Sequence, residues 1–98
     1  MAKDELLEKE ILLEDFLDAF EEGQLEESED IIDEYIELFA DDAMGYYHMG
    51  QVQQVKGDWD EALYYLGKAV EMLPGQPQFM EEIANVHIEL GDWPSATE

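Results

Sequence analysis

Cysteine and arginine are both missing from this sequence of 98 residues. Without Cys, the chain has no disulfides, no thiolate zinc site and no cysteine nucleophile. Cations are scarce as well, because four Lys stand against 27 acidic residues and leave a formal net charge of −23. Nucleic-acid phosphates and anionic lipid surfaces are both bound through basic groups. The composition therefore argues against nucleic acid and membranes as partners.

Long apolar runs are also lacking. No stretch approaches the roughly 18 residues that a membrane-spanning helix needs, and the first residues lack the basic and apolar parts of a secretion signal. We therefore expect a cytoplasmic protein, unless the 98 residues were cut from a longer chain. Apolar residues still make up 46% of the sequence, which is enough for a packed interior. We expect one small domain over residues 1–98.

Three glycines recur at a constant spacing. Gly23, Gly57 and Gly91 are each 34 residues apart. A polar residue and a large apolar residue follow each of them: Gln24 and Leu25, Asp58 and Trp59, Asp92 and Trp93. Gly readily adopts the left-handed conformation that ends a helix, and the polar residue is placed to cap the next one. Asp58 with Glu61 resembles a capping box. The pattern predicts repeated pairs of helices joined by tight turns.

Apolar residues at helical spacing predict five helices, over residues 3–22, 25–39, 43–56, 60–73 and 77–90. Asp4 is a candidate cap for the first helix, which is longer than a repeat needs by about one and a half turns. A sixth helix should begin near Trp93, with Asp92 as its cap and Pro94 in its first turn. Repeat arrays normally end in a polar capping helix. We therefore infer a fragment of a longer repeat protein, or a partner chain that covers the fifth helix.

Residues 46–74 carry the most specific motif. Tyr46 is followed after two residues by Met49 and Gly50, then by Ala62 and Pro74 at intervals of twelve. This pattern resembles the tetratricopeptide repeat, a helix-turn-helix unit of about 34 residues. The repeats would cover residues 9–42, 43–76 and 77–98, with the last one truncated. The first repeat departs from the family pattern, because Asp15 and Phe16 stand at its usual Leu and Gly or Ala positions. A generic helical bundle is the competing fold, and the repeated turn argues against it.

The resemblance implies an all-α, right-handed superhelical stack of antiparallel helix pairs, with five helices and a short C-terminal turn. It also implies a protein-protein interaction module, in which the first helices of successive repeats line a concave groove that holds a peptide or a helix. Positions matching that groove are Leu17, Phe20, Tyr47, Gln51, Gln54, Gln78, Asn85 and Ile88, together with Leu13, Val55, Glu81 and Glu89. Some of these residues, Leu13 and Phe20 above all, are equally well explained as core residues. The alternative role is a structural spacer or a self-association segment of a longer repeat protein.

One subgroup of the family binds the C-terminal carboxylate of heat-shock chaperones through Lys, Asn and Arg. The matching positions in this chain are Leu13, Leu17, His48, Gln78 and Glu82. None of them is cationic, and Glu82 would repel a carboxylate. The chaperone tail is therefore not the expected partner.

No constellation of residues points to catalysis. His48 and His87 are the only histidines, and Glu81, Glu82 and His87 are spaced so that they spread around a helix rather than converge on a metal. The Ser and Thr residues lie in no nucleophile motif, and the acidic pairs have no neighbour that would separate their pKa values. We expect no enzyme activity, metal or cofactor.

The acidity allows two hypotheses. The first is adaptation to high salt, where a uniformly acidic surface stays soluble and its self-repulsion is screened. The second is an acidic face for a basic partner, because residues 1–42 hold 18 acids and two Lys whereas residues 43–98 hold nine acids and two Lys. We favour salt adaptation, since even the most regular repeat contains almost no Lys.

Overall fold

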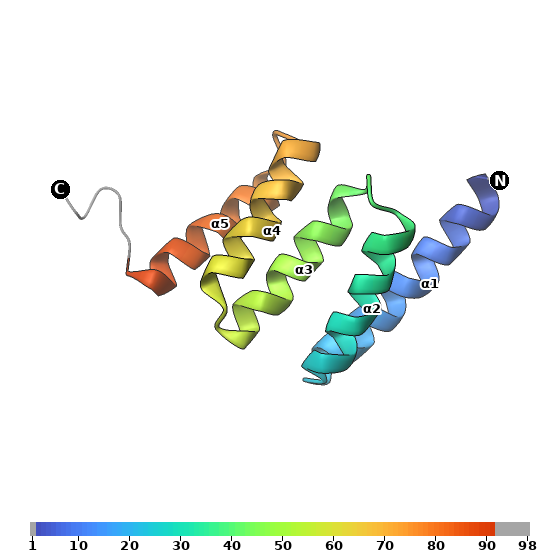
Figure 1. Ribbon diagram of the computed structural model, residues 1–98, viewed down its shortest axis with the longest axis horizontal. Coiled ribbons are helices and arrows are strands. Elements are labelled where there is room, and N and C mark those ends of the chain that lie inside the picture. The colour runs from blue at the N-terminus through green and yellow to red at the C-terminus, as the bar shows by residue number, and fades with distance from the viewer. Residues whose placement is uncertain (1, 92–98) are drawn as a thin grey trace.

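Five α-helices make up the part of the chain that the structure describes, residues 2–91 of a computed structural model, and no strand occurs within this range. They are α1 (Ala2–Glu21), α2 (Leu25–Leu38), α3 (Ala43–Lys56), α4 (Trp59–Met72) and α5 (Pro77–Leu90) (Figure 1). The sequence predicted α3 and α5 at both ends, and each end of the other helices within one residue. The sixth helix expected from Trp93, with Asp92 and Pro94, lies outside the described residues. Asp4 lies in the first turn of α1 rather than before it, so the prediction that it caps this helix is wrong.

The repeated glycines adopt the predicted left-handed conformation. Gly23, Gly57 and Gly91 have φ angles of +79°, +84° and +75°. After α3, the Gly57 N–H donates to the Gln54 carbonyl at 3.0 Å, and the Asp58 N–H donates to the Gln53 carbonyl at 2.9 Å. These two bonds satisfy carbonyls at the end of α3 that the helix itself leaves free. The 34-residue period therefore reflects a repeated way of ending a helix.

The predicted capping box at α4 does not form. Asp58 occupies the cap position, but its side chain makes no capping hydrogen bond. Its ψ angle is 79°, outside the extended range from which a cap side chain reaches the first N–H groups of the helix. The turn between α3 and α4 has only two residues, Gly57 and Asp58, and Asp58 takes this conformation within it. Asp42, by contrast, is extended and caps α3, since its Oδ1 accepts from the Met44 N–H at 3.0 Å.

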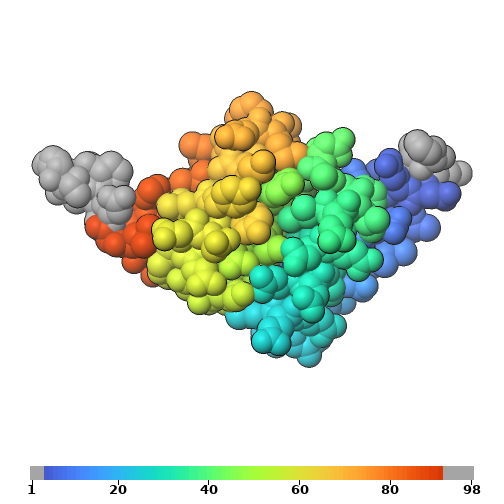
Figure 2. Space-filling view, viewed as in Figure 1, coloured from blue at the N-terminus to red at the C-terminus, as the bar shows by residue number. Residues whose placement is uncertain are grey.

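The helices pack in the order of the sequence. Each helix contacts the next one along the chain, and α3 also contacts α5. Figure 1 shows the five helices in a row from α1 to α5, and the space-filling view in Figure 2 shows side chains of α2, α3 and α4 closing the spaces between the ribbons. The principal extents are 52 × 28 × 17 Å. This layout makes each helix depend mainly on its neighbours in sequence.

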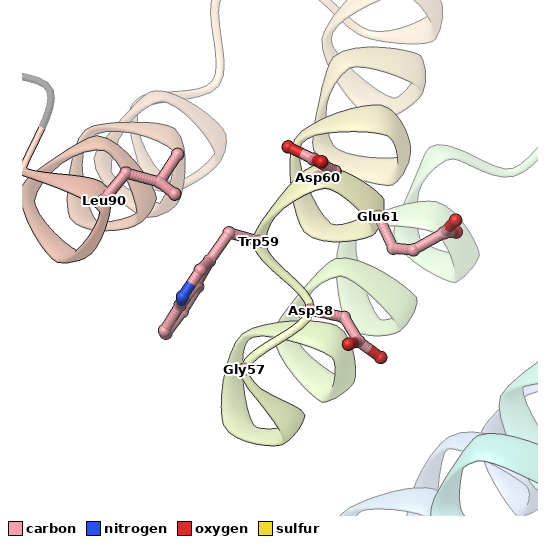
Figure 3. A pocket seen from close by; sticks show the side chains of 6 residues that line it. All are labelled: Gly57, Asp58, Trp59, Asp60, Glu61 and Leu90. Atoms are coloured by element: carbon pink, nitrogen blue, oxygen red, sulfur yellow. The ribbon is translucent and has the colours of Figure 1, made fainter.

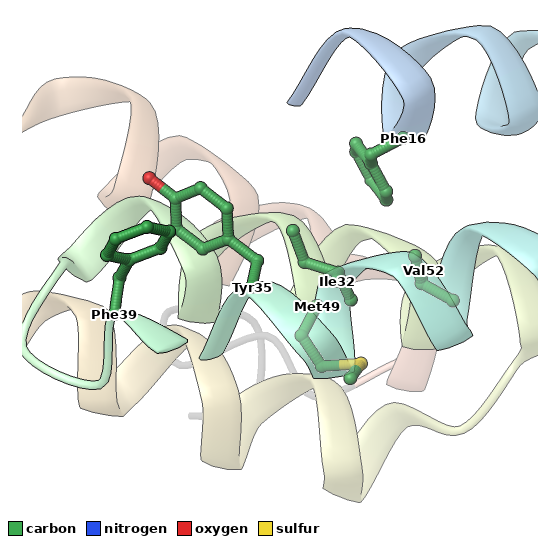
Figure 4. Packing of buried hydrophobic residues seen from close by; sticks show 6 residues of the cluster. All are labelled: Phe16, Ile32, Tyr35, Phe39, Met49 and Val52. Carbon is green, nitrogen blue, oxygen red and sulfur yellow. The ribbon is translucent and has the colours of Figure 1, made fainter. Parts of the chain in front are cut away.

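The largest cluster of buried side chains lies between α1, α2 and α3. Phe16 from α1 and Ile32 from α2 are fully buried, and Met49 and Val52 of α3 close the cluster from the other side (Figure 4). Two smaller clusters continue the core, one around Ala43, Ala69 and Phe79 and the other around Ala62, Leu66 and Val86.

The first and second helix pairs pack differently at matching positions. A Cβ atom on Gly50 of α3 would lie 2.7 Å from Leu66 Cγ, so the α4 side chain rests directly on bare α3 backbone. In α1 the matching position, 34 residues earlier, is Phe16, whose ring is completely buried. The α1–α2 pair therefore accommodates a phenyl ring where α3–α4 has no side chain at all. This difference is the physical outcome of the irregular first repeat noticed in the sequence.

Asp42 connects three helices at one end of the molecule. Besides capping α3, its Oδ2 accepts from the Tyr35 hydroxyl of α2 at 2.7 Å and pairs with Lys9 Nζ of α1 at 3.0 Å. Burial alone would raise the pKa of Asp42, but the hydrogen bonds from Tyr35, Lys9 and the Met44 N–H outweigh it and hold the pKa below its usual value. The carboxylate form of Asp42 therefore stabilises the fold.

Candidate functional site

A series of aromatic contacts links α1, α3 and α5, the helices predicted to line the groove. Phe16 and Phe20 of α1 stack with ring centroids 5.4 Å apart, and Phe16 lies 4.9 Å from the His48 ring of α3. Tyr47, the residue before His48 on α3, contacts Phe79 of α5 with ring centroids 5.0 Å apart. Stacked and tilted ring pairs add to the stabilisation from burial alone. These contacts join α1, α3 and α5, and two of the rings, Phe20 and Tyr47, are themselves predicted groove positions.

The middle of α3 presents a polar but uncharged group of side chains. Gln51 Nε2 donates to the Tyr47 hydroxyl at 3.3 Å, and Gln51 Oε1 lies 3.0 Å from His48 Nδ1. Because the amide oxygen only accepts, His48 donates through a protonated Nδ1. Burial lowers the pKa of His48, against weaker opposing effects of Gln51 and Asp42, so the ring is neutral at neutral pH. Burial, together with the nearby acids of α5, raises the pKa of Tyr47.

A hollow of about 430 Å³ lies between α3 and α5, which we call the α3–α5 hollow. Gln54 Nε2 of α3 donates to Glu82 Oε1 of α5 at 2.7 Å and so ties the two helices together beside it. Val55 gives the hollow an accessible apolar wall, since 58% of this residue is exposed. The side chains lining it are Gln54, Val55, Trp59, Asn85 and Glu89. The hollow therefore combines apolar, amide and carboxylate groups within reach of one ligand.

The predicted groove residues are distributed unevenly. Gln54 and Asn85 meet at the α3–α5 hollow, and Tyr47 and Gln51 are hydrogen-bonded to each other on α3. Phe20 is half-buried and packs against the core, as one of the two interpretations of this residue expected. Exposed predicted residues that do not line the hollow are Leu17, Gln78, Glu81 and Ile88.

Two residues at this site were not identified from the sequence in their present roles. The sequence pattern places Trp59 in the repeated turn, but in the structure it also lines the hollow and packs against the cluster of Ala62, Leu66 and Val86. For Glu82, the sequence predicts only that its charge would repel a carboxylate ligand. Its bond to Gln54 spans 28 residues, and no local sequence pattern predicts such a pair. The sequence does contain one signal for Trp59, because it is the large apolar residue that follows the turn of Gly57 and Asp58.

A second hollow, of about 400 Å³, lies on the other side of Trp59 between the start of α4 and the end of α5. In Figure 3 the indole of Trp59 and the side chain of Leu90 border it, whereas the carboxylates of Asp58 and Glu61 point away from the indole. Its polar groups do not converge. This hollow therefore offers a ligand less than the α3–α5 hollow does.

Carboxylates also gather between α1 and α2, where Asp15, Asp18, Glu22 and Glu27 border a hollow of about 420 Å³. Among the described residues, however, no three or more His, Asp or Glu side chains are placed to hold a metal ion. None of the helices described is long and apolar enough to cross a bilayer. Comparison of the chain with family models and with curated protein sequences gives no match.

Proposed function

We propose that this chain is a non-catalytic protein-interaction module of the tetratricopeptide type. Its repeats would form a right-handed superhelical stack, and a peptide or helix would bind in the groove lined by α1, α3 and α5. Three features support this proposal: the 34-residue Gly period with left-handed backbone, the packing of each helix on the next, and the ring contacts that join the first helices of the pairs.

The α3–α5 hollow is the observation that carries the proposal. Gln54 and Asn85, from two helices, border the same space with the exposed Val55. Amide side chains both donate and accept, so they suit the N–H and C=O groups of a bound peptide backbone. An accessible apolar residue beside them suits a peptide side chain. The partner would be a protein or peptide with apolar or basic residues, and neither a nucleic acid nor a membrane.

A heat-shock chaperone tail is not the proposed partner. Glu82 would stand where that subgroup needs a cation, and its carboxylate lies beside the hollow through its bond to Gln54. A peptide carboxylate brought there would meet a like charge.

The test is peptide selection followed by affinity measurements. A random-peptide display library would be selected against the full chain, and enriched peptides would be measured by fluorescence anisotropy. We expect Asn85→Ala to weaken binding about tenfold and Tyr64→Ala, an exposed change on α4, to leave it unaltered. A larger loss from Tyr64→Ala than from Asn85→Ala would contradict binding in the groove. Failure to enrich any peptide would also count against the proposal.

Self-association is the second candidate function, because α5 exposes large apolar side chains. Met80, Ile88 and Leu90 are 53%, 46% and 41% exposed. α1, at the other end of the row, exposes Leu6, Leu7, Ile11 and Leu17 as well, and exposed apolar side chains are suited to an interface. Light scattering after gel filtration distinguishes the candidates. A monomer at every concentration supports the peptide-binding module, whereas a dimer that Met80→Gln and Ile88→Gln dissociate supports self-association.

A further inference from the structure

Among the residues that line the α3–α5 hollow, the one charged group is the Glu89 carboxylate. The Gln54 amide nitrogen donates one of its two hydrogens to Glu82, and the Gln54 carbonyl oxygen can accept from a ligand. Glu89 adds a carboxylate, and Asn85 adds a second amide oxygen. A carboxylate accepts hydrogen bonds at both oxygens and donates none. A ligand group with several donors therefore suits this carboxylate and the two amide oxygens beside it.

Positive charge is absent from the hollow, because the described lysine side chains are engaged elsewhere. Lys9 pairs with Asp42 at 3.0 Å, Lys56 pairs with Glu29 at 2.7 Å, and Lys68 lies 5.8 Å from the centre of the Tyr46 ring. No residue lining the hollow is cationic. The Glu89 carboxylate is therefore not neutralised by any residue that lines the hollow. A cationic group on a ligand would neutralise it.

An indole forms one wall of the same hollow. Trp59 is half-buried and packs against the cluster of Ala62, Leu66 and Val86, which are all fully buried. The face of an indole attracts a cation, and Trp is the best aromatic side chain for this contact. Among natural side chains, only the Arg guanidinium combines a flat cation that stacks on a ring with five N–H donors.

We propose that the α3–α5 hollow binds an Arg side chain of the partner peptide. The guanidinium stacks on Trp59 and donates to the Glu89 carboxylate and the Gln54 carbonyl oxygen, while a neighbouring apolar residue of the peptide packs on Val55. The hollow's volume of about 430 Å³ lies within the usual range for ligand sites. This inference rests on the proposed function and specifies which residue the groove selects.

The test uses a synthetic probe and its neutral isostere. A fluorescein-labelled peptide Gly-Ser-Leu-Ala-Arg-Ala-Ser-Gly would be compared with the same peptide carrying citrulline, which keeps the shape of Arg without its charge, and with a Lys version. We expect the Arg peptide to bind about tenfold more tightly than either by anisotropy. We also expect it to shift the Trp59 indole N–H resonance, which a Trp93→Phe background leaves as the only indole signal.

Matched variants separate this site from general attraction to an acidic surface. Glu89→Gln and Glu34→Gln each remove one negative charge from an exposed position, the first at the hollow and the second on α2. We expect about a tenfold loss of Arg-peptide affinity for Glu89→Gln and less than about a twofold loss for Glu34→Gln. Trp59→Leu should reduce the preference for Arg over Lys, with circular dichroism as the check of folding.

Equal affinity for the Arg and citrulline peptides would overturn the inference, as would equal losses from the two Glu variants. These outcomes differ from failure of the proposed function. Display-selected peptides that bind along α1, α3 and α5 without an Arg requirement would overturn the Arg site and leave the groove in place. Selected peptides that bind instead on the exposed faces of α2 and α4, at Glu34 or Tyr64, would overturn both.

Discussion

At the scale of single residues, the packing of α4 on α3 depends on the absence of a side chain at one position. Gly50 lies in the interior of α3, and an added Cβ would come within 2.8 Å of two Leu66 atoms. Gly67 also lies inside a helix, α4, but an added Cβ there would meet nothing within 4 Å. Substitution by Ala therefore adds a methyl group to a packed contact at Gly50 and to open space at Gly67.

We predict opposite effects of Ala at these two sites. Gly50→Ala should lower the free energy of unfolding by about 1 to 3 kcal/mol, because Leu66 must move out of a packed core. Gly67→Ala should raise it by about 0.5 to 1 kcal/mol, because Ala favours the helix. Urea unfolding followed by circular dichroism measures both. A stabilising Gly50→Ala would show that α3 and α4 are not packed as described.

Asp42 is the residue whose loss should be most costly among the surface acids. Asp42→Ala removes a helix cap and leaves the Tyr35 hydroxyl without its acceptor. We predict a loss of about 2 to 3 kcal/mol in the free energy of unfolding. The neighbouring exposed change Asp41→Ala should alter it by less than about 0.5 kcal/mol. Equal effects of the two variants would contradict the role given to Asp42.

The contribution of Asp42 should also depend on pH. The folded pKa of Asp42 lies below its ordinary value of 3.8, so the unfolded chain binds the proton more readily. The stabilisation is therefore complete above pH 3.8 and disappears as the pH falls through the lower folded value. The stability difference between the wild type and Asp42→Asn should shrink over that acidic range. A difference that stays constant there would contradict this assignment.

At the scale of the helices, the backbone at each turn sets where an element ends. We predict that Gly57→Ala lowers the free energy of unfolding by about 1 to 2 kcal/mol, because the left-handed backbone is unfavourable for a residue with a Cβ. No neighbour lies within 4 Å of the added atom, so the effect comes from the backbone and not from a clash. Gly57→Asn should cost less, since Asn tolerates this conformation better. Thermal unfolding of the three proteins tests the order.

The helices could be predicted from the sequence because their signals are local. The Gly turns and the apolar spacing set the ends of α3 and α5 without reference to the rest of the chain. The site could be predicted only in part, because it depends on contacts between distant residues. Gln54 and Asn85 followed from their repeat positions, whereas the Gln54–Glu82 bond and the exposure of Trp59 to the hollow depend on how α3 and α5 meet. Asp58 shows a similar limit, because its cap failed through a backbone angle that residue types do not reveal.

At the scale of the whole molecule, the net charge of −23 should make stability depend on salt. Screening weakens the repulsion among the acids of the surface. If the acidity is an adaptation to salt, the melting temperature should rise steadily between about 0.1 and about 3 M NaCl. A variant with Gln in place of Glu10, Glu14, Glu34 and Glu37, all exposed, should show a smaller rise. No rise beyond that of this variant would contradict the salt hypothesis and favour a basic partner.

The central claim is that a ligand binds along the first helices of the pairs. The most direct measurement is an NMR titration of the ¹⁵N-labelled chain with the tightest peptide from display selection. The account predicts the largest shifts at Gln51, Gln54 and Asn85, with little change on the exposed faces of α2 and α4. Shifts concentrated at Glu34 and Tyr64 instead would contradict it.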